Sequence, residues 1–291
     1  MKSVLVVGTG TMGRGIAQVT ASAGLETRVC DVNLGVAERA VASIAEALDR
    51  RVVQGKLDAV ERSAIVARLH ASDDLVAAAA GIELAIEAVP EDMALKVRVL
   101  ATVAKAAPPT AILASNTSSL SVTELGQRLE AGDRTVGLHF FNPPPAMALL
   151  EIVRGLHTTE AVVDQCQVLA KRLGKTSILV NDSPGFATSR LGVALGAEAI
   201  RMLEAGVASV EDIDRAMELG YRHPMGPLKL GDLVGLDVRL AILEHLHREV
   251  GEQFRPPQLL RQMVRAGWLG KKSGKGFYDW SGETPIARKL V

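Results

Sequence analysis

A short apolar run that ends in a glycine-rich turn near the start of the chain constrains this sequence most. Residues 4–7 read Val-Leu-Val-Val, and a Gly-x-Gly-x-x-Gly pattern follows, with glycines at Gly8, Gly10 and Gly13. Gly8 permits a tight turn from strand to helix, Gly10 lets a pyrophosphate approach the backbone, and Gly13 lets the helix pack close to the strand. The free N–H groups at the start of the helix favour phosphate groups. The pattern predicts a dinucleotide site.

The residues around this turn strengthen that prediction. Thr11 and Met12 lie inside the motif, and we expect them to line the cofactor site with the glycines. A second predicted strand, residues 25–30, ends at Asp31, where an acid can hold both ribose hydroxyls of NAD. The alternative is a strand-to-helix turn that merely tolerates glycine.

Composition narrows the class of protein. The 291 residues are enough for one large domain or two modest ones. The 33 basic and 33 acidic residues give zero formal net charge, which argues against nucleic acid or an anionic membrane as a partner. No apolar run is long enough to span a bilayer, and the first predicted strand begins too early for a signal peptide to precede it. The two cysteines give no disulfide framework, so we expect a cytoplasmic protein.

Predicted strands and helices alternate along the first two thirds of the chain. Further strands are predicted at 81–89, 111–114, 135–139, 149–153 and 176–180, and helices at 37–52, 59–69, 91–107 and 160–173. Such alternation indicates a parallel sheet with helices on both faces, an α/β domain of the Rossmann type. The glycine turn, Asp31, Glu91 and the polar loop 115–119 all follow strand ends, where ligands bind in such sheets.

Turn residues at 181–185 mark the best domain boundary. We therefore predict a dinucleotide-binding domain at 1–183 and an all-α domain at 184–291. Helices are predicted there at 186–204, 213–219, 237–250 and 257–266, and Ser209 with Asp212 resembles a capping box. This domain is expected to supply the second wall of a cleft and a subunit interface.

Three residues suggest catalysis. His139 ends a predicted strand, Glu151 lies on a neighbouring strand, and Ser118 lies in the polar loop. A carboxylate on one imidazole nitrogen leaves the other to move a proton, and with NAD the natural reaction is oxidation of a secondary alcohol. The alternative is a core histidine that a buried acid satisfies. No Cys, His and acid cluster has metal-ligand spacing, so no metal is expected.

Basic residues cluster at the end of the predicted helix 37–52. Arg50 and Arg51 close that helix, and Lys56 follows it. They either complement the helix C-terminus or bind the phosphates of a large anionic substrate.

Seven motifs occur in order and resemble one family over nearly the whole chain. They are residues 8–13, 85–91, 115–119, 139–143, 182–186, 223–227 and 270–278. Together they resemble the short-form L-3-hydroxyacyl-CoA dehydrogenases, the family that includes 3-hydroxybutyryl-CoA dehydrogenases. The resemblance implies reversible NAD-dependent oxidation of an (S)-3-hydroxyacyl-CoA to the 3-oxoacyl-CoA, with His139 as the general base oriented by Glu151.

The resemblance also implies roles for other residues. Ser118 corresponds to the serine that hydrogen-bonds the substrate oxygen near the nicotinamide, and Asn116 is assigned to the substrate with it. The implied contacts to NAD or its site are Glu91, Lys96, Asn142 and Lys272. Arg50, Arg51 and Lys56 lie where the family binds coenzyme A, although the residue types differ. The family implies a homodimer formed through the helical domain.

One position departs from the family pattern. Ser189 stands where the family commonly carries an asparagine that helps to bind and polarise the acyl group. Apart from this position, two alternatives to the family activity stay open: a dehydrogenase of a non-CoA 3-hydroxy acid, of the gulonate or carnitine type, and a non-catalytic NAD-binding protein of the crystallin type. Only a CoA substrate needs the basic cluster, and only an enzyme needs Ser118, His139 and Glu151 together.

Overall fold

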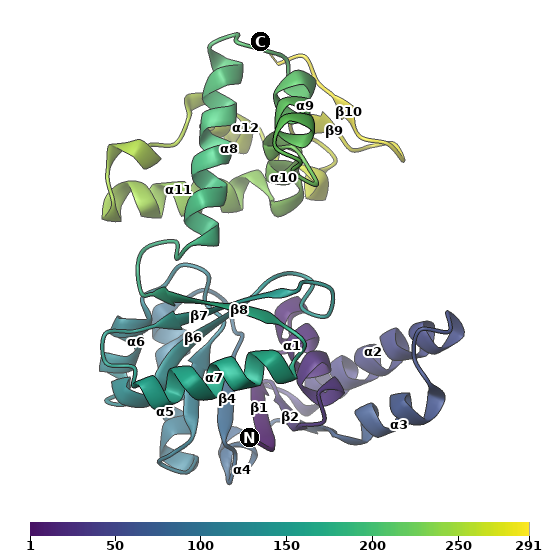
Figure 1. Cartoon of the computed structure of the whole chain (residues 1–291), viewed down its shortest axis with the longest axis vertical. Helices are drawn as coiled ribbons and strands as arrows, with labels where there is room; N and C mark the ends of the chain where they lie inside the picture. Colours follow the sequence, from purple (N-terminus) through teal and green to yellow (C-terminus); the bar gives the residue numbers. More distant parts are fainter. Residues whose placement is uncertain (291) are drawn as a thin grey trace. The chain divides into compact units, whose positions relative to one another are not determined.

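Residues 1–290 are described by the computed structural model (Figure 1), which has two compact units that divide after Ser183. The N-terminal unit is built on one eight-stranded sheet of order β3-β2-β1-β4-β5-β6-β7-β8. Its strands are β1 (Ser3–Val7), β2 (Glu26–Cys30), β3 (Leu69–Ser72), β4 (Leu84–Glu87), β5 (Ile112–Ser115), β6 (Thr135–Phe140), β7 (Leu149–Arg154) and β8 (Thr176–Asn181). The strands from β3 to β6 in this order pair in parallel, which confirms the predicted Rossmann-type α/β fold.

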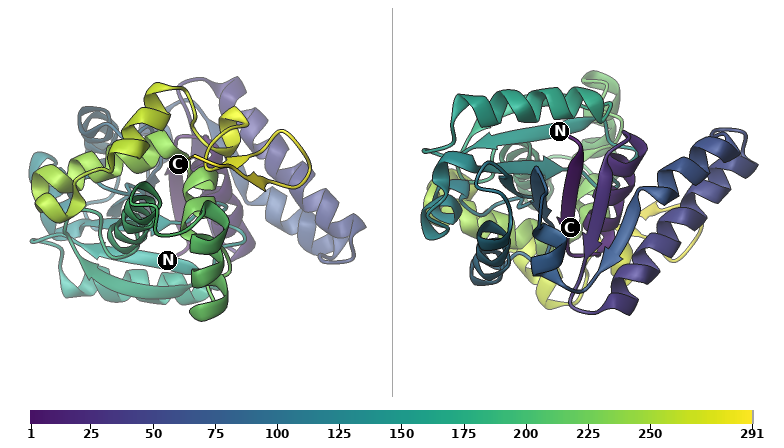
Figure 2. Two further views of the ribbon diagram at one scale, coloured as in Figure 1. Left: turned by 90° about the horizontal axis from the view of Figure 1, so that it is seen from above. Right: turned by 90° about the horizontal axis from the view of Figure 1, so that it is seen from below.

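Helices cover both faces of this sheet because its central strands are apolar on both sides. The helices are α1 (Thr11–Ser22), α2 (Leu34–Val53), α3 (Ala59–Ala67), α4 (Leu75–Ala79), α5 (Met93–Ala106), α6 (Val122–Arg128) and α7 (Glu160–Arg172), with a 3₁₀ turn at Gly132–Arg134. In β1, Val4 and Val6 enter a core shared with α1, α2 and α7, whereas Leu5 and Val7 enter a second core shared with α4, α5 and α6. Figure 2 shows α2 and α3 side by side at one end of the sheet.

The sheet differs from the sequence prediction at both of its ends. β7 pairs with β6 in antiparallel orientation, and β8 runs parallel to β7. The loop 141–148 between β6 and β7 is shorter than the crossover that a parallel pair requires, which explains the reversal. At the other end, the helix predicted to reach residue 69 stops at Ala67, because Leu69–Ser72 pairs with β2 as an edge strand.

The C-terminal unit is helical, as predicted, but the helix at Pro227–Val234 and a short strand pair were not predicted. Its helices are α8 (Thr188–Glu204), α9 (Val210–Gly220), α10 (Pro227–Val234), α11 (Leu236–Glu249) and α12 (Gln258–Arg265), with 3₁₀ turns at Glu252–Phe254 and Lys271–Ser273. Ser209 caps α9 by accepting the Asp212 amide at 3.1 Å. Two short antiparallel strands, β9 (Tyr278–Asp279) and β10 (Ile286–Ala287), were not predicted.

Two buried aspartates attach this strand pair to the helices. Asp232 of α10 accepts the amides of Phe277 and Tyr278 and the indole N–H of Trp280. Asp214 of α9 accepts the Tyr278 hydroxyl and two amides at the start of α10. Burial raises the pKa of both carboxyl groups despite these hydrogen bonds.

No helix within residues 1–290 has the length and apolar character needed to cross a bilayer.

Candidate active site

The three glycines of the turn allow the tight turn, the open backbone and the close helix packing that the sequence predicts. Gly8 adopts a φ of +93°, and a Cβ atom there would lie 2.8 Å from the carbonyl oxygen of Ala88. A Cβ on Gly13 would lie 1.8 Å from the carbonyl oxygen of Gly8, so the first turn of α1 packs directly on the strand end. Gly10 has open space where its side chain would be. The turn therefore leaves room for a pyrophosphate beside the start of α1.

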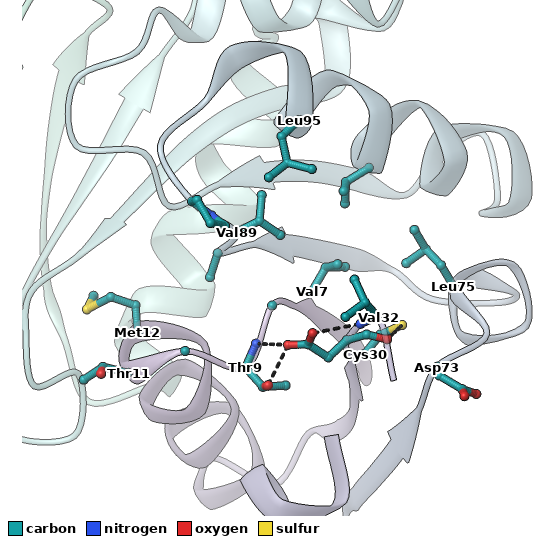
Figure 3. Close-up of a pocket in the computed structure, with 16 residues that line it drawn as sticks. Val7, Thr9, Thr11, Met12, Cys30, Val32, Asp73, Leu75, Val89 and Leu95 are labelled. Carbon is teal, nitrogen blue, oxygen red and sulfur yellow. Dashed lines mark hydrogen bonds between the residues drawn. The ribbon is translucent and has the colours of Figure 1, made fainter. Parts of the chain in front are cut away.

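Asp31 is held in place by the same turn (Figure 3). Its Oδ2 atom accepts the Thr9 amide at 2.8 Å and the Thr9 hydroxyl at 2.6 Å, and its Oδ1 atom accepts the Val32 amide at 2.8 Å. Burial alone would raise the pKa of this carboxyl, but the hydrogen bonds from Thr9 and Val32 hold it below its ordinary value. Asp31 is therefore a fixed carboxylate at the end of β2.

A cavity of about 620 Å³ extends from the turn past Asp31. Apolar side chains form most of its lining, as expected for a site that takes an adenine ring: Val7, Met12, Val32, Leu75, Val89, Leu95 and Val99. Burial, with the nearby charges of Asp31, Asp73 and Asp74, raises the pKa of the Cys30 thiol to about 11, so this cysteine is a protonated core residue. These residues fit an adenosine group.

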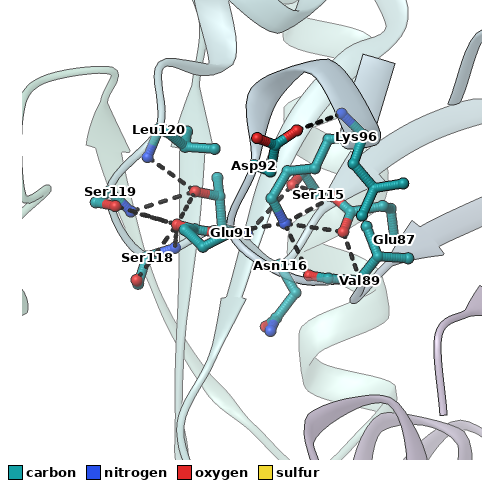
Figure 4. Close-up of polar contacts among 12 residues, drawn as sticks. Glu87, Val89, Glu91, Asp92, Lys96, Ser115, Asn116, Ser118, Ser119 and Leu120 are labelled. Carbon is teal, nitrogen blue, oxygen red and sulfur yellow. Dashed lines mark hydrogen bonds and ion pairs between the residues drawn. The ribbon is translucent and has the colours of Figure 1, made fainter. Parts of the chain in front are cut away.

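A second polar cluster lies where β4 and β5 end (Figure 4). One carboxylate oxygen of Glu91 accepts hydrogen bonds from the amides of Ser118 and Ser119 at 3.0 and 3.2 Å and from the Thr117 hydroxyl at 2.6 Å. Its other oxygen lies 3.1 Å from Nζ of Lys96. Burial acts to raise the pKa of Glu91, but Lys96 and these hydrogen bonds lower it overall. Glu91 thus fixes the loop that carries Ser118.

Lys96 itself is 1 % exposed and is shared between two acids. Its Nζ atom lies 2.8 Å from Oε1 of Glu87, the fully buried last residue of β4. Glu87 also accepts the Ser115 hydroxyl at 2.6 Å and the Val89 amide at 2.7 Å. Lys96 therefore joins the end of β4 to Glu91 and the polar loop.

His139 and Glu151 form a direct cross-strand pair. They are register partners in β6 and β7, so their side chains leave the sheet on the same face. Nδ1 of His139 lies 2.6 Å from Oε2 of Glu151, and the two residues are 7 % and 0 % exposed. The Phe141 ring lies 4.5 Å from the His139 ring, centroid to centroid. The contact leaves a carboxylate on one nitrogen of a buried imidazole.

The polar loop is also attached to β6 beside the histidine. The side-chain oxygen of Asn116 accepts the Phe140 amide at 2.9 Å. Within the N-terminal unit, the structure thus places Ser118, Asn116 and Glu91 after the neighbouring strands β5 and β4, and Asn142 in the loop that follows β6. Lys96 lies on α5 and reaches the end of β4 with its Nζ atom.

The other predicted site residues lie at the end of α2 and in the C-terminal unit. Arg50 and Arg51 are exposed in the last turn of α2, and Lys56 is exposed in the turn after it. Ser189 lies in the first turn of α8, in the C-terminal unit. Lys272 belongs to that unit too, where its Nζ atom lies 2.6 Å from Oδ1 of Asp237.

The sequence analysis missed Glu87, Thr9 and Thr117. Glu87 could have been found by the signal that identified Glu151, an acid inside a strand whose other residues are apolar. Thr9 and Thr117 give no such signal, because short hydroxyl residues are common in turns whether or not they bind a neighbour.

Comparison with known proteins defines the class. The model of the 3-hydroxyacyl-CoA dehydrogenase NAD-binding domain matches residues 3–183, and that of the 3-hydroxyacyl-CoA dehydrogenase C-terminal domain matches residues 185–280. The chain therefore belongs to the 3-hydroxyacyl-CoA dehydrogenase family, whose members are NAD-dependent oxidoreductases. The family resemblance, the enzyme class and the cofactor predicted from sequence are confirmed.

Individual relatives are similar over most of their length. A probable 3-hydroxybutyryl-CoA dehydrogenase of Bacillus subtilis is 44% identical over 285 residues, covering 98% of this chain and 99% of the relative. The crystal structure of (S)-3-hydroxybutyryl-CoA dehydrogenase from Ralstonia eutropha superposes with a TM-score of 0.94 at 41% identity, covering 97% of this chain and 100% of that one. A 3-hydroxyadipyl-CoA dehydrogenase of Escherichia coli is 40% identical, covering 97% of this chain and 60% of the relative.

Proposed function

We propose that the protein oxidises (S)-3-hydroxybutyryl-CoA, or a close (S)-3-hydroxyacyl-CoA, to the 3-oxoacyl-CoA with NAD, and that His139 and Glu151 carry the proton transfer. The observation that carries this proposal is the 2.6 Å contact between Nδ1 of His139 and Oε2 of Glu151 in a buried setting. The 3-hydroxybutyryl-CoA names of similar proteins support the choice of substrate.

The path of the transferred proton follows from the hydrogen bond that holds the imidazole of His139. Glu151 accepts the Nδ1 proton of His139, which selects the tautomer with a basic Nε2 atom. That atom takes the proton of the substrate hydroxyl, and the carboxylate stabilises the imidazolium that forms. Bound NAD supplies the acceptor for the hydride that leaves the carbinol carbon. In the reverse direction, the imidazolium returns its proton to the oxygen of the reduced product.

Most of the cofactor contacts that we propose come from residues directly after the strands of the sheet. Asp31 holds the adenosine ribose, and the turn holds the pyrophosphate through Gly8, Gly10, Thr11, Met12 and Gly13. Glu91, Lys96, Asn142 and Lys272 are assigned to NAD or to the order of its site. Ser118 hydrogen-bonds the substrate oxygen beside the nicotinamide, with Asn116 on the substrate side of the loop. The Glu91 hydrogen bonds to residues 117–119 support this assignment, because they fix the serine before substrate binds.

We assign recognition of the coenzyme A part of the substrate to basic residues, and recognition of its acyl part to a residue of the helical unit. Exposed Arg50, Arg51 and Lys56 bind the phosphates of coenzyme A. Ser189 reaches the acyl group less directly than the family's asparagine, because it offers one donor on a shorter side chain. Replacing Ser189 by alanine should therefore lower kcat/KM less than tenfold, whereas Ser118→Ala should lower it much further. Equal losses would mean that Ser189 has the role of the asparagine.

The assembly and location are proposed from the family and the composition. We infer a cytoplasmic homodimer formed through the helical unit. Sedimentation or light scattering of the full chain tests the dimer, and a monomer at micromolar concentration would contradict it.

The activity is tested with purified protein and a panel of substrates. NADH formation is followed by absorbance with (S)-3-hydroxybutyryl-CoA, longer (S)-3-hydroxyacyl-CoA esters and 3-hydroxyadipyl-CoA. We expect turnover with NAD and the short (S) ester, and none with the (R) ester. Turnover of free 3-hydroxy acids in preference to CoA esters would overturn the proposal in favour of a non-CoA dehydrogenase, and no turnover of any member would favour a binding protein.

A further inference from the structure

Lys175 is a buried lysine in the turn between α7 and β8. It is 9 % exposed, and within residues 1–290 no carboxylate forms an ion pair with it. Its Nζ atom instead donates to two backbone carbonyl oxygens, that of Pro144 at 2.6 Å and that of Met147 at 2.5 Å. Burial lowers the pKa of its ammonium group. The only partners that the structure gives this ammonium are therefore in one segment, the loop 141–148.

A buried ammonium group without a carboxylate is unfavourable unless its hydrogen bonds offset the loss of hydration. The carbonyl oxygen of buried Pro144 also needs a donor, since a buried carbonyl without a partner is itself unfavourable. Lys175 satisfies both carbonyl groups with one side chain. It thereby ties two points of the loop, three residues apart, to the start of β8.

The loop also packs against α1. A Cβ atom on Gly15 would lie 2.6 Å from Cδ of Pro144, which is buried. Proline cannot turn aside as a flexible side chain can, so Gly15 allows a contact that any other residue would prevent. Gly15 lies two residues after the glycine turn. Pro144 is thus seated against the helix that begins at the proposed pyrophosphate site, and Lys175 keeps it there.

The same loop begins directly after the histidine strand. Phe141, its first residue, has its ring 4.5 Å from the ring of His139. A shift of the loop away from α1 would therefore move the Phe141 ring and change the packing of the imidazole relative to the glycine turn. Hydride and proton transfer depend on that relative position, because an error of about 1 Å can lower a rate by about a hundredfold.

We propose that Lys175 is a positioning residue for the dehydrogenase reaction: it fixes loop 141–148 against α1 and so sets where His139 stands relative to the dinucleotide turn. This inference rests on the proposed function, because it concerns the rate of that reaction. Lys175 itself touches neither substrate nor cofactor in this account. Its effect should appear mainly in kcat and little in the binding of NADH, because Asn142 is the one proposed NADH contact in this loop, whereas the glycine turn and Asp31 lie outside it.

The test compares Lys175→Met, which keeps the chain length but removes the donors, with Lys175→Arg, which keeps donors. Lys171→Met, at the exposed end of α7, is the matched control for loss of one charge. For each protein, kcat and KM are measured with NAD and (S)-3-hydroxybutyryl-CoA, NADH affinity by fluorescence titration, and folding by thermal melting. We expect kcat of Lys175→Met to fall tenfold to a hundredfold, with NADH affinity within about twofold of wild type. Lys175→Arg should recover part of kcat, and Lys171→Met should match wild type.

Gly15→Ala disturbs the same loop by placing a methyl group against Pro144. This second variant tests the proposal if Lys175→Met does not fold. It should give the same pattern, with reduced kcat and retained NADH affinity. The proposal is overturned if folded Lys175→Met or Gly15→Ala has wild-type kcat, or if kcat falls only in proportion to the folded fraction. An inactive wild-type protein that binds NADH would instead contradict the proposed function.

Discussion

Nδ1 of His139 lies 2.6 Å from Oε2 of Glu151, and the two residues face each other directly in the antiparallel register of β6 and β7. Side chains that are direct partners in such a register lie on one face and within contact distance. A register shift of one residue would turn Glu151 to the opposite face. The loop 141–148, which makes the two strands antiparallel, is therefore what gives the histidine its carboxylate.

Removing either member of this pair should lower turnover without affecting cofactor binding. We expect His139→Gln to reduce kcat by roughly two to four orders of magnitude, the usual contribution of a positioned general base. Glu151→Gln should reduce kcat as well, because an amide cannot balance the imidazolium charge. Steady-state kinetics and NADH titration separate the two effects. Near-normal turnover by His139→Gln would show that another group carries the proton.

The cofactor preference should depend on Asp31. Its carboxylate would repel the 2′-phosphate of NADPH, and Arg28 cannot compensate because its guanidinium donates to the carbonyl oxygens of Ala78 and Ala80. Asp31→Ala should raise the ratio of kcat/KM for NADPH to that for NADH by about tenfold or more. Asp49→Ala, which removes an exposed acid of α2, is the control. A wild-type preference for NADPH would refute this assignment.

Two glycines of the same turn should respond differently to alanine. Gly10 has a φ of −59° and open space beside it, so Gly10→Ala should keep the melting temperature but weaken NADH binding more than tenfold. Gly13→Ala would place a methyl group 1.8 Å from the Gly8 carbonyl oxygen and should lower the melting temperature by about 5 °C or more. Melting curves and NADH titrations check both. A stable Gly13→Ala protein would show that the backbone of α1 can shift at this point.

Sequence periodicity and motif spacing were sufficient to predict the central strands of the sheet and the helices beside them. The strand before the glycine turn is apolar on both faces, so it could be recognised as a central strand of a parallel sheet. The direction of β7 could not be recognised in this way, because the pattern of apolar residues is the same for a parallel and an antiparallel strand. Only the length of loop 141–148 carries that information.

Partners within the site were harder to predict than the residues themselves. Glu91 and Lys96 were assigned to the cofactor site by resemblance, but the hydrogen bond from Ser115 to Glu87, the second partner of Lys96, depends on β4 and β5 being neighbours. Lys175 is a lysine in a turn, which sequence alone indicates to be exposed, and only the path of the chain around it shows that it is buried. Such contacts are set by tertiary packing and have no local pattern.

The basic cluster at the end of α2 should act on substrate binding alone. Replacing Arg50, Arg51 and Lys56 together by alanine should raise KM for the acyl-CoA more than it lowers kcat, because remote phosphate contacts contribute uniform binding. The effect should shrink at high salt, since exposed charges are screened. KM measured at low and high ionic strength tests this. An unchanged KM at low salt would leave these residues as a charged helix end.

Acid should destabilise the N-terminal unit more than the C-terminal unit. In the N-terminal unit, the lowered pKa values of Asp31 and Glu91 mean that the folded state holds protons less readily than the unfolded state. Their contribution to stability is present above about pH 5 and is lost as pH falls through the folded pKa values. In the C-terminal unit, the raised pKa values of buried Asp214 and Asp232 mean that their protonation favours the folded state. This gain opposes the loss expected from the lowered pKa values of Asp237, Glu252 and Asp279.

The chain offers a direct readout of this difference. Both tryptophans, Trp268 and Trp280, lie in the C-terminal unit, so their fluorescence reports on that unit, and NADH binding reports on the other. During acid titration, NADH binding should be lost before the tryptophan signal changes. Asp214→Asn should reduce the separation between the two transitions. Coincident transitions in the wild-type protein would contradict the prediction.

The three hydrogen bonds that hold Asp31 have a consequence for the kinetics of cofactor exchange. Thr9 and Val32 fix the carboxylate before any ligand arrives, so the free energy of immobilising this side chain is already included in folding. The ribose that we propose it binds therefore meets a rigid acceptor, and association needs no rearrangement at this point. Variants that loosen the carboxylate, such as Thr9→Val, should then change the residence time of NADH on the protein more than the speed of its arrival.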